Sequence, residues 1–254
     1  MTNHSPDHTH DSHCWWSSDE AHWVCRTPAS TTLTADRPLV DVRDMVVVHT
    51  ALLREFRLAP VAVTRTSPTD RRQVRRVAAH LTLLCDLLHH HHAGEDALLW
   101  PLLTQRAPTA VQHTIEHAET QHAQIDAALT RVRGGLEAWA TAPGADTGGR
   151  LGGDLDALHT VLRAHLELEE AVLLPHAAAL LTSDEWHAIG AAAVEALPKP
   201  LLPLVFGMFA YEGDPAVLAD MLAQAPAVPR LLLPHVAPRA YLRRARRVHG
   251  TPRP

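Results

Sequence analysis

Cysteine and aromatic residues are scarce in this chain, and each scarcity excludes a class of protein. Three cysteines among 254 residues are an odd and sparse set, which fits a reducing compartment better than a disulfide scaffold. Aromatic residues make up 4% of the chain, and runs of β-branched residues are rare. Because strands favour both kinds of residue, we expect an all-α fold.

Long hydrophobic runs and a secretion signal are also lacking. The longest apolar stretch, LLPLVFGMFAY from Leu201, is too short to cross a bilayer and is flanked by proline. No basic segment leads into an apolar one at the amino-terminus. The formal net charge of −5 gives no general reason to bind nucleic acid. We therefore expect a cytoplasmic protein that binds neither membranes nor nucleic acids.

Histidine, in contrast, is abundant. Twenty histidines indicate metal binding or a response to pH. Residues 1–37 carry several of them without sustained periodicity, so we predict a disordered, His-rich tail there. Within it, His13, Cys14, His22 and Cys25 are a candidate zinc site, although their spacing is not that of a zinc knuckle. A disordered tail that binds metal loosely is the alternative.

Breakers divide the rest of the chain into helical segments. Four long segments are separated by the stretches APVAVTRTSP, RAP and TAPGADTGGRLGG. Short connections between long helices predict an up-down-up-down four-helix bundle over residues 38–182. Shorter segments fill residues 183–254 and end in an arginine-rich stretch, which is most often the solvated face of a last helix. We expect a bundle followed by a helical carboxy-terminal extension with a basic end.

Each of the four predicted bundle helices has an apolar stripe that a histidine interrupts. These four residues are His49, His91, His122 and His165. On the second and fourth helices a glutamate, Glu95 or Glu169, follows four residues later on the same face. One such histidine is usually a satisfied core residue. Four of them at one level with two carboxylates are costly unless a cation compensates them, so the stripes predict a metal site.

Helix phase selects among neighbouring carboxylates. At about 100° per residue, Glu169 shares the face of His165, whereas Glu170 turns towards solvent or a helix flank. Glu119 precedes His122 by one turn and faces inward. We therefore predict Glu169 as a ligand, Glu170 as a surface residue and Glu119 as a candidate additional ligand.

Other histidines fall outside the predicted site. His89 and His90 leave the stripe of the second helix, and His92 lies at its edge. His80 and His176 share stripes with the predicted ligands but lie about 16 Å further along the helix axis. They are too distant to bind the same ion.

With these residues the chain resembles a known family, the hemerythrin-like or HHE cation-binding domain. The resemblance covers roughly residues 40–181. The matching pieces are HTALLREF from His49, HHAGEDALLWP from His91, ETQHAQID around His122 and HLELEEAVLLP from His165. Each piece alone is weak, but their order, with a proline closing the second and the fourth, is specific.

The resemblance implies a four-helix bundle around a non-haem di-iron centre with bridging carboxylates and oxo or hydroxo species. The positions that match the family's ligands are His49, His91, Glu95, His122, His165 and Glu169. Because members of the family place the last carboxylate four or five residues after the histidine, the resemblance also permits Glu170 in place of Glu169. Oxygen-carrying members use five histidines and two carboxylates, whereas here Ala118 occupies the place one turn before His122, and Glu119 is the candidate substitute. Extra carboxylates stabilise ferric iron, which argues against reversible oxygen carriage. The part after Leu181 resembles the carboxy-terminal extension of actinobacterial hemerythrin-like proteins.

Two functions follow from this resemblance. The first, which we favour, is a module that binds or senses oxygen, nitric oxide or iron through the di-iron centre. The second is a di-iron enzyme that consumes peroxide or oxygen, in the manner of a catalase or peroxidase. No cofactor fingerprint or nucleophilic triad occurs in the sequence, so we expect a small diatomic ligand or peroxide as the partner. A metal-free helical protein is the third alternative, and the sequence leaves the oligomeric state open.

Overall fold

The computed structural model of the chain describes residues 14–17, 22–25, 38–223 and 225–254. Within the last two ranges every regular element is a helix, as the composition predicts. None of the helices in the described ranges is by itself long and apolar enough to cross a membrane. The helix at Ser183–Ala196 and the segment Lys199–Phe209 pass that test together, by length and composition only, as a pair bent by 102°.

Two short strands precede the helices. β1 (Cys14–Ser17) and β2 (His22–Cys25) pair antiparallel, and Cys14 is the partner of Cys25 in their register. This hairpin departs from the expectation that the tail lacks regular structure. The four-residue segments CWWS and HWVC are rich in tryptophan and valine, which favour strands. The remainder of the tail, with His13 of the candidate zinc site, lies outside the described residues.

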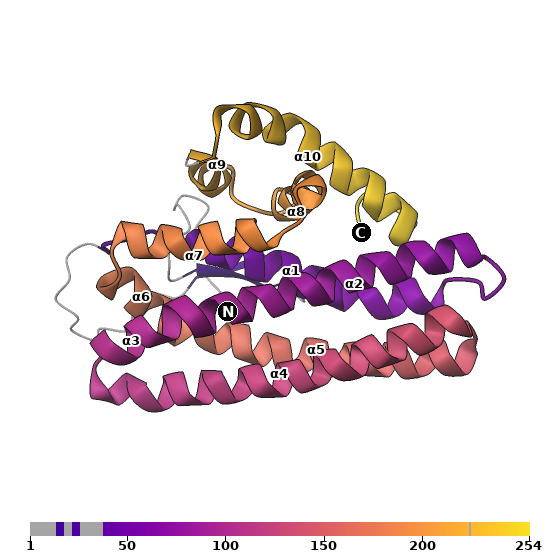
Figure 1. The fold of residues 1–254 in the computed structure, drawn as a ribbon, viewed down its shortest axis with the longest axis horizontal. Coiled ribbons are helices and arrows are strands. Elements are labelled where there is room, and N and C mark those ends of the chain that lie inside the picture. Colours follow the sequence, from indigo (N-terminus) through magenta and orange to yellow (C-terminus); the bar gives the residue numbers. More distant parts are fainter. Residues whose placement is uncertain (1–13, 18–21, 26–37, 224) are drawn as a thin grey trace.

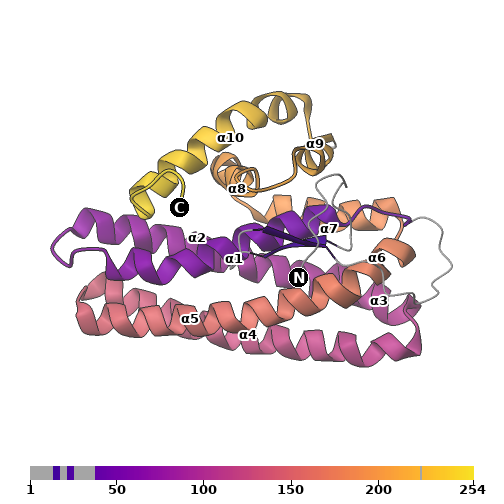
Figure 2. The same ribbon diagram turned by 180° about the vertical axis from the view of Figure 1, so that it is seen from behind.

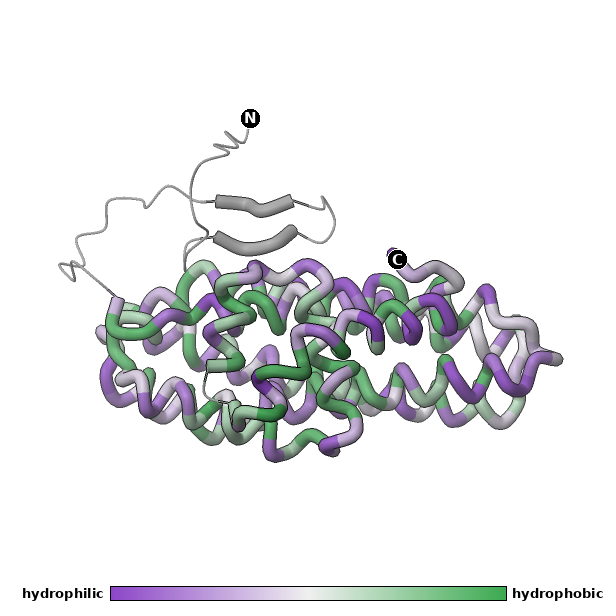
Figure 3. The backbone as a smooth tube through the Cα atoms, turned by 90° about the horizontal axis from the view of Figure 1, so that it is seen from above, coloured by the Kyte–Doolittle hydropathy of each residue, from purple (hydrophilic) through white to green (hydrophobic). Residues whose placement is uncertain are grey.

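Four long helices lie side by side and form the body of the molecule (Figures 1 and 2). They are α1 (Arg43–Thr64), α2 (Arg71–Gly94), α4 (Thr109–Thr141) and α5 (Ala145–Leu168). Helix α1 contacts α2 and α5, and α4 contacts the same two helices. Apolar residues recur along each helix between hydrophilic ones (Figure 3), so each helix buries one face against its neighbours.

Helices α2 and α5 continue through a π-helical turn into a short helix. The π-helical segments are η1 (Glu95–Leu99) and η2 (Glu169–Leu173), and the short helices are α3 (Trp100–Arg106) and α6 (Leu174–Leu180). The N–H of Trp100 donates to the carbonyl oxygen of Glu95, five residues back. Pro101 comes next, and because proline lacks an N–H and its ring crowds the preceding turn, a widened turn is favoured here. Pro175 occupies the equivalent place after η2.

These widened turns move the buried stripe by one residue. The sequence predicts Leu98 and Leu102 in the core, whereas the structure buries Leu99 and Leu103 completely and Leu98 and Leu102 only in part. Because a π-helical turn contains one more residue than an α-helical turn, each later position on the buried face is reached one residue further along the sequence. The predicted stripe is therefore correct before η1 and one residue out of phase after it.

A second layer, formed by the carboxy-terminal helices, covers α1 and α2 on the side away from α4 and α5 (Figure 1). Its elements are α7 (Ser183–Ala196), the 3₁₀ turn η3 (Lys199–Leu201), α8 (Leu202–Phe209), α9 (Pro215–Ala223) and α10 (Ala227–Val248). Helix α7 begins with a capping box between Thr182 and Glu185, which satisfies backbone N–H groups at its start. Helix α10 packs on α8 and reaches α2.

Candidate metal centre

A layer of histidines and glutamates separates two apolar clusters inside the body of the molecule. On α1, Met45 belongs to one cluster and Leu52 to the other, and His49 lies between them. On each of the other three long helices, with its continuation, the polar residues likewise lie between residues of the two apolar clusters. The polar side chains of this layer are His49, His91, His92, Glu95, His122, His165, Glu169 and Glu170. We call these eight residues the polar layer.

The polar layer holds two groups of potential ligand atoms, each within 4.8 Å of one another. One group contains His92, Glu95, His122 and His165, and the other contains His49, His91 and Glu95. Glu95 belongs to both, so the groups adjoin through one carboxylate. Its Oε1 lies 3.3 Å from Nε2 of His91, and its Oε2 lies 3.5 Å from Nε2 of His122.

Glu169 joins the two groups a second time. Its Oε2 lies 3.6 Å from Nε2 of His49 and 3.7 Å from Nε2 of His165. Both glutamates are fully buried and stand between imidazoles of the two groups.

Many buried polar atoms of the layer have no hydrogen-bond partner among the described residues. They are Nε2 of His49 and of His91, both ring nitrogens of His92, and both carboxylate oxygens of Glu95 and of Glu169. Leaving one such atom unpaired costs about 1–3 kcal/mol. A cation bound by these nitrogens and oxygens removes that cost, and the donor set therefore fits a metal ion.

Burial shifts the pKa values in the layer towards the neutral forms. It raises the pKa of both Glu170 and Glu95. The nearby Glu169 carboxylate raises the pKa of Glu95 in addition. Burial, together with the neighbouring imidazoles, lowers the pKa of His91 well below its usual value and that of His165 to about 2. Burial thus favours neutral imidazoles, the form that binds a metal ion, and neutral carboxyls, which must lose their protons in order to bind one.

Three imidazoles are oriented by an oxygen outside the two groups. The Nδ1 contacts are His122 with Asp96 Oδ1 at 2.7 Å, His165 with Gln121 Oε1 at 3.2 Å, and His49 with Glu170 Oε1 at 2.8 Å. When Nδ1–H donates to such an oxygen, the lone pair of Nε2 is left for a metal ion. In each case Nε2 is the nitrogen that faces the layer.

Glu170 does not lie where a regular helix would place it. The phase of α5 predicts a residue turned towards solvent or a flank, but Glu170 is 7% exposed and accepts a hydrogen bond from His49. The cause is η2, whose widened turn begins at Glu169 and brings both glutamates inward. The signal in the sequence is Pro175, six residues after Glu169, as Pro101 is six residues after Glu95.

His92 is the functional residue that the stripe argument underrates. It is 2% exposed, and its ring stacks on that of His122 at 4.1 Å. It follows Leu88 by four residues and precedes Glu95 by three, so it fits the buried face as well as His91 does. With His92 the layer has five imidazoles.

Glu119 lies apart from both groups. The side chain is exposed and borders an open pocket of about 340 Å³ lined by Asp96, Glu119, His122, Ala123 and Asp126. The remaining predicted ligands, His49, His91, Glu95, His122, His165 and Glu169, all come together in the layer. His89 and His90 are exposed, as predicted, and His80 belongs to a separate buried group.

Comparison with known proteins agrees with this geometry. The model of the hemerythrin HHE cation-binding domain matches residues 40–177, which is more than half of the chain and contains the whole polar layer. A search of curated proteins and a search of solved structures found no significant match. The domain match and the His/Glu donor set both indicate a cation-binding domain, and the chain belongs to the hemerythrin HHE cation-binding family.

Proposed function

We propose that the polar layer holds two iron ions inside an up-down-up-down four-helix bundle, and that the pair binds or senses oxygen, nitric oxide or iron itself. The observation that carries this proposal is the sharing of Glu95 and Glu169 between two groups of imidazoles. A single ion would leave one group of buried, unpaired nitrogens without compensation.

The donor set also supports iron. Imidazole and carboxylate are donors that suit non-haem iron. The buried thiol of Cys85 lies outside the layer, in one of the apolar clusters. When bound, the iron pair supplies redox chemistry and an open coordination position for a small ligand.

The two groups differ in the number of imidazoles, and this difference indicates where a small ligand binds. One ion would take His92, His122 and His165, and the other His49 and His91, with Glu95 and Glu169 common to both. The ion with fewer protein ligands has more room for an external one. A reducing cytoplasm, which the sparse cysteines indicate, suits a ferrous resting state.

Consumption of peroxide is a second candidate, and Glu170 is the observation that favours it. Oε1 of Glu170 accepts from Nδ1 of His49 at 2.8 Å, and burial, which raises the pKa of Glu170, favours a proton on the other oxygen of this carboxyl. Reduction of peroxide requires protons in the dry interior, and Glu170 is placed to supply one.

The first experiment is elemental analysis of the purified chain together with its absorbance spectrum, with and without azide. We expect two irons per chain and charge-transfer bands. Zinc alone, or no metal, would contradict the proposal.

The second experiment separates the two candidates. Reversible spectral changes with oxygen or nitric oxide, without peroxide turnover, support the sensing module. Peroxide consumption that falls at least tenfold in Glu170→Gln, at an unchanged iron content, supports the enzyme.

A further inference from the structure

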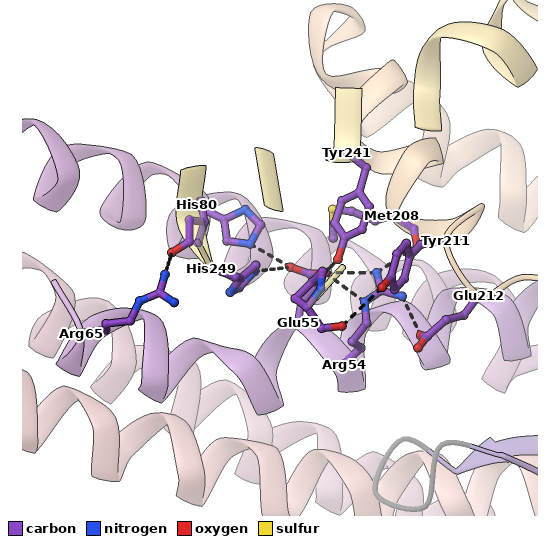
Figure 4. A network of polar contacts seen from close by, with 11 residues as sticks. Arg54, Glu55, Arg65, His80, Met208, Tyr211, Glu212, Tyr241 and His249 are labelled. Atoms are coloured by element: carbon purple, nitrogen blue, oxygen red, sulfur yellow. Dashed lines mark hydrogen bonds and ion pairs between the residues drawn. The ribbon is translucent and has the colours of Figure 1, made fainter. Parts of the chain in front are cut away.

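A second buried group of potential ligands lies outside the polar layer. It consists of Glu55 on α1, His80 on α2 and His249, directly after α10, with ligand atoms within 4.8 Å of one another (Figure 4). All three side chains are buried. His80 precedes His91 by eleven residues, about 16 Å along a helix, so the group is separate from the layer. His249 lies beyond the residues that match the hemerythrin domain.

The end of α10 fixes the position of His249. His249 is the helix C-cap, and Gly250 follows with a φ of 75°, the left-handed conformation that glycine adopts readily at this place. The Arg65 side chain lies next to Gly250, where a Cβ atom would otherwise point, and donates to the carbonyl oxygen of Val248. A Cβ at position 250 would lie 2.6 Å from Arg65 Nη2. The chain end is therefore held in one conformation, with the imidazole directed inward.

Two imidazoles converge on one carboxylate oxygen. Nε2 of His80 lies 2.9 Å from Glu55 Oε2, and Nε2 of His249 lies 3.4 Å from the same atom. The longer distance is poor for a hydrogen bond. Bonds of about 2.0–2.1 Å at tetrahedral angles, as in zinc sites, place neighbouring ligand atoms about 3.3 Å apart. The two distances to Oε2 lie on either side of this value, and all three ligand atoms lie within 4.8 Å of one another, which is compatible with a shared cation.

The other carboxylate oxygen is already fully used. Glu55 Oε1 accepts from Tyr241 Oη at 2.6 Å and from Nε and Nη2 of Arg54 at 3.1 Å each. If both imidazoles also donated, five donors would share a carboxylate that offers about four acceptor positions. A cation bound to Oε2 would take the place of the two imidazole protons that compete for this oxygen.

The charges around Glu55 permit a cation at this group, even though Arg54 is near. Arg54 also pairs with Glu212, whose Oε2 lies 2.7 Å from Nη1, so two carboxylates face one guanidinium. Burial alone would raise the pKa of Glu55, but hydrogen bonds with His249 and His80 hold it well below its usual value. Burial lowers the pKa of His80. An ionised carboxylate is the form that a metal ion binds.

We propose that Glu55, His80 and His249 bind a divalent transition-metal ion such as Zn²⁺, which ties the carboxy-terminal helix to α1 and α2. Two imidazoles and a carboxylate supply three ligands, and water completes a tetrahedral site. The ion acts as a clamp, because its ligands come from three helical segments that are distant in the sequence. This site does not depend on which metal occupies the polar layer.

The test is a zinc titration of the full chain after it has been loaded with iron and freed of excess metal. Zinc and iron per chain are counted together by elemental analysis, and the unfolding temperature is recorded. We expect one zinc per chain above any amount that replaces iron, with an unfolding temperature several degrees higher. His249→Gln, whose amide can still donate to Glu55, should lose this zinc and the shift. His235→Ala, an exposed histidine on the same helix, should keep both.

Two results would overturn the clamp. One is a wild-type chain that takes up zinc only as iron is lost, and the other is His249→Gln that binds as much zinc as wild type. His80→Gln gives the same comparison if His249→Gln does not fold. Because iron is counted in the same samples, a failure of the polar layer to hold two irons is seen separately.

Discussion

The described part of the chain contains two buried sets of histidine and glutamate, the polar layer and the group of Glu55, His80 and His249, that compensate their charges in different ways. In the polar layer, the oxygens of Glu95 and Glu169 have no hydrogen-bond partner among the described residues. In the second group, Glu55 accepts hydrogen bonds from Arg54 and Tyr241. Burying polar groups without partners is far more costly than burying paired ones. The layer therefore requires a cation, whereas the second group only accommodates one.

The largest effect should come from the carboxylate that both ligand groups share. Glu95→Gln keeps the size of the side chain but removes the bridging charge, so we expect less than one iron per chain in place of two. Iron analysis measures this. Glu119→Gln is the control, since that residue is exposed, and should retain both irons. Two irons in Glu95→Gln would show that the layer does not share its ligands in this way.

The second group should respond in stability rather than in iron content. Glu55→Gln leaves the buried Arg54 with one carboxylate partner, and breaking a buried ion pair costs about 3–5 kcal/mol. Urea unfolding of the iron-loaded proteins would give this difference, and the iron count should stay at two. Glu212→Gln removes the less buried partner of Arg54 and should cost less. An equal loss of stability in both variants would contradict the view that Glu55 is the more important carboxylate partner of Arg54.

Glu170 tests whether an outer oxygen orients a ligand. Glu170→Ala leaves Nδ1 of His49 without its acceptor, and loss of such a partner weakens metal binding about 10–100-fold. Glu170→Gln retains an oxygen at that position, so its iron affinity should stay within a few-fold of wild type. Competition with a chelator measures both affinities. Equal losses in the two variants would instead indicate that the Glu170 carboxylate itself binds iron.

Asp44 extends the comparison to a buried carboxyl that is compensated by neutral hydrogen-bond donors, the Trp186 indole and the N–H of Met45. Burial raises its pKa to about 6, although Nε1 of Trp186 donates to it at 3.1 Å. Because the folded pKa exceeds the unfolded one, the folded state binds this proton more tightly. The stabilising contribution is full below the unfolded pKa of 3.8 and is lost as pH rises through about 6.

Asp44→Asn should therefore be more stable than wild type at pH 7.5. We expect about 2 kcal/mol, because two pKa units correspond to nearly 3 kcal/mol and the carboxylate gains some of that back at a helix start. The advantage should shrink as pH falls to 4.5, where wild-type Asp44 is largely protonated. Thermal unfolding at the two pH values checks this. An advantage that is independent of pH would mean that ionisation is not its cause.

Much of the fold and six of the eight residues of the layer follow from helix periodicity alone. His49, His122 and His165 are buried where the apolar stripes place them, because α1, α4 and α5 are regular up to those residues. The four long helices are predictable for the same reason, since breakers and apolar spacing are local properties.

The residues that the sequence did not reveal depend on departures from local regularity. Glu170 turns inward through a π-helical segment, which a constant 100° per residue cannot represent. His92 shares a face with His91, and only packing against His122 selects it. The contact of His249 with Glu55 joins positions 194 residues apart, so no spacing rule connects them.

The most direct test of two cations sharing Glu95 and Glu169 is Mössbauer spectroscopy of the chain reconstituted with ⁵⁷Fe, together with the iron count. The predicted result is two irons per chain that behave as one magnetically coupled pair, because carboxylates common to both ions hold them together. One iron per chain, or two irons without coupling, would contradict the account.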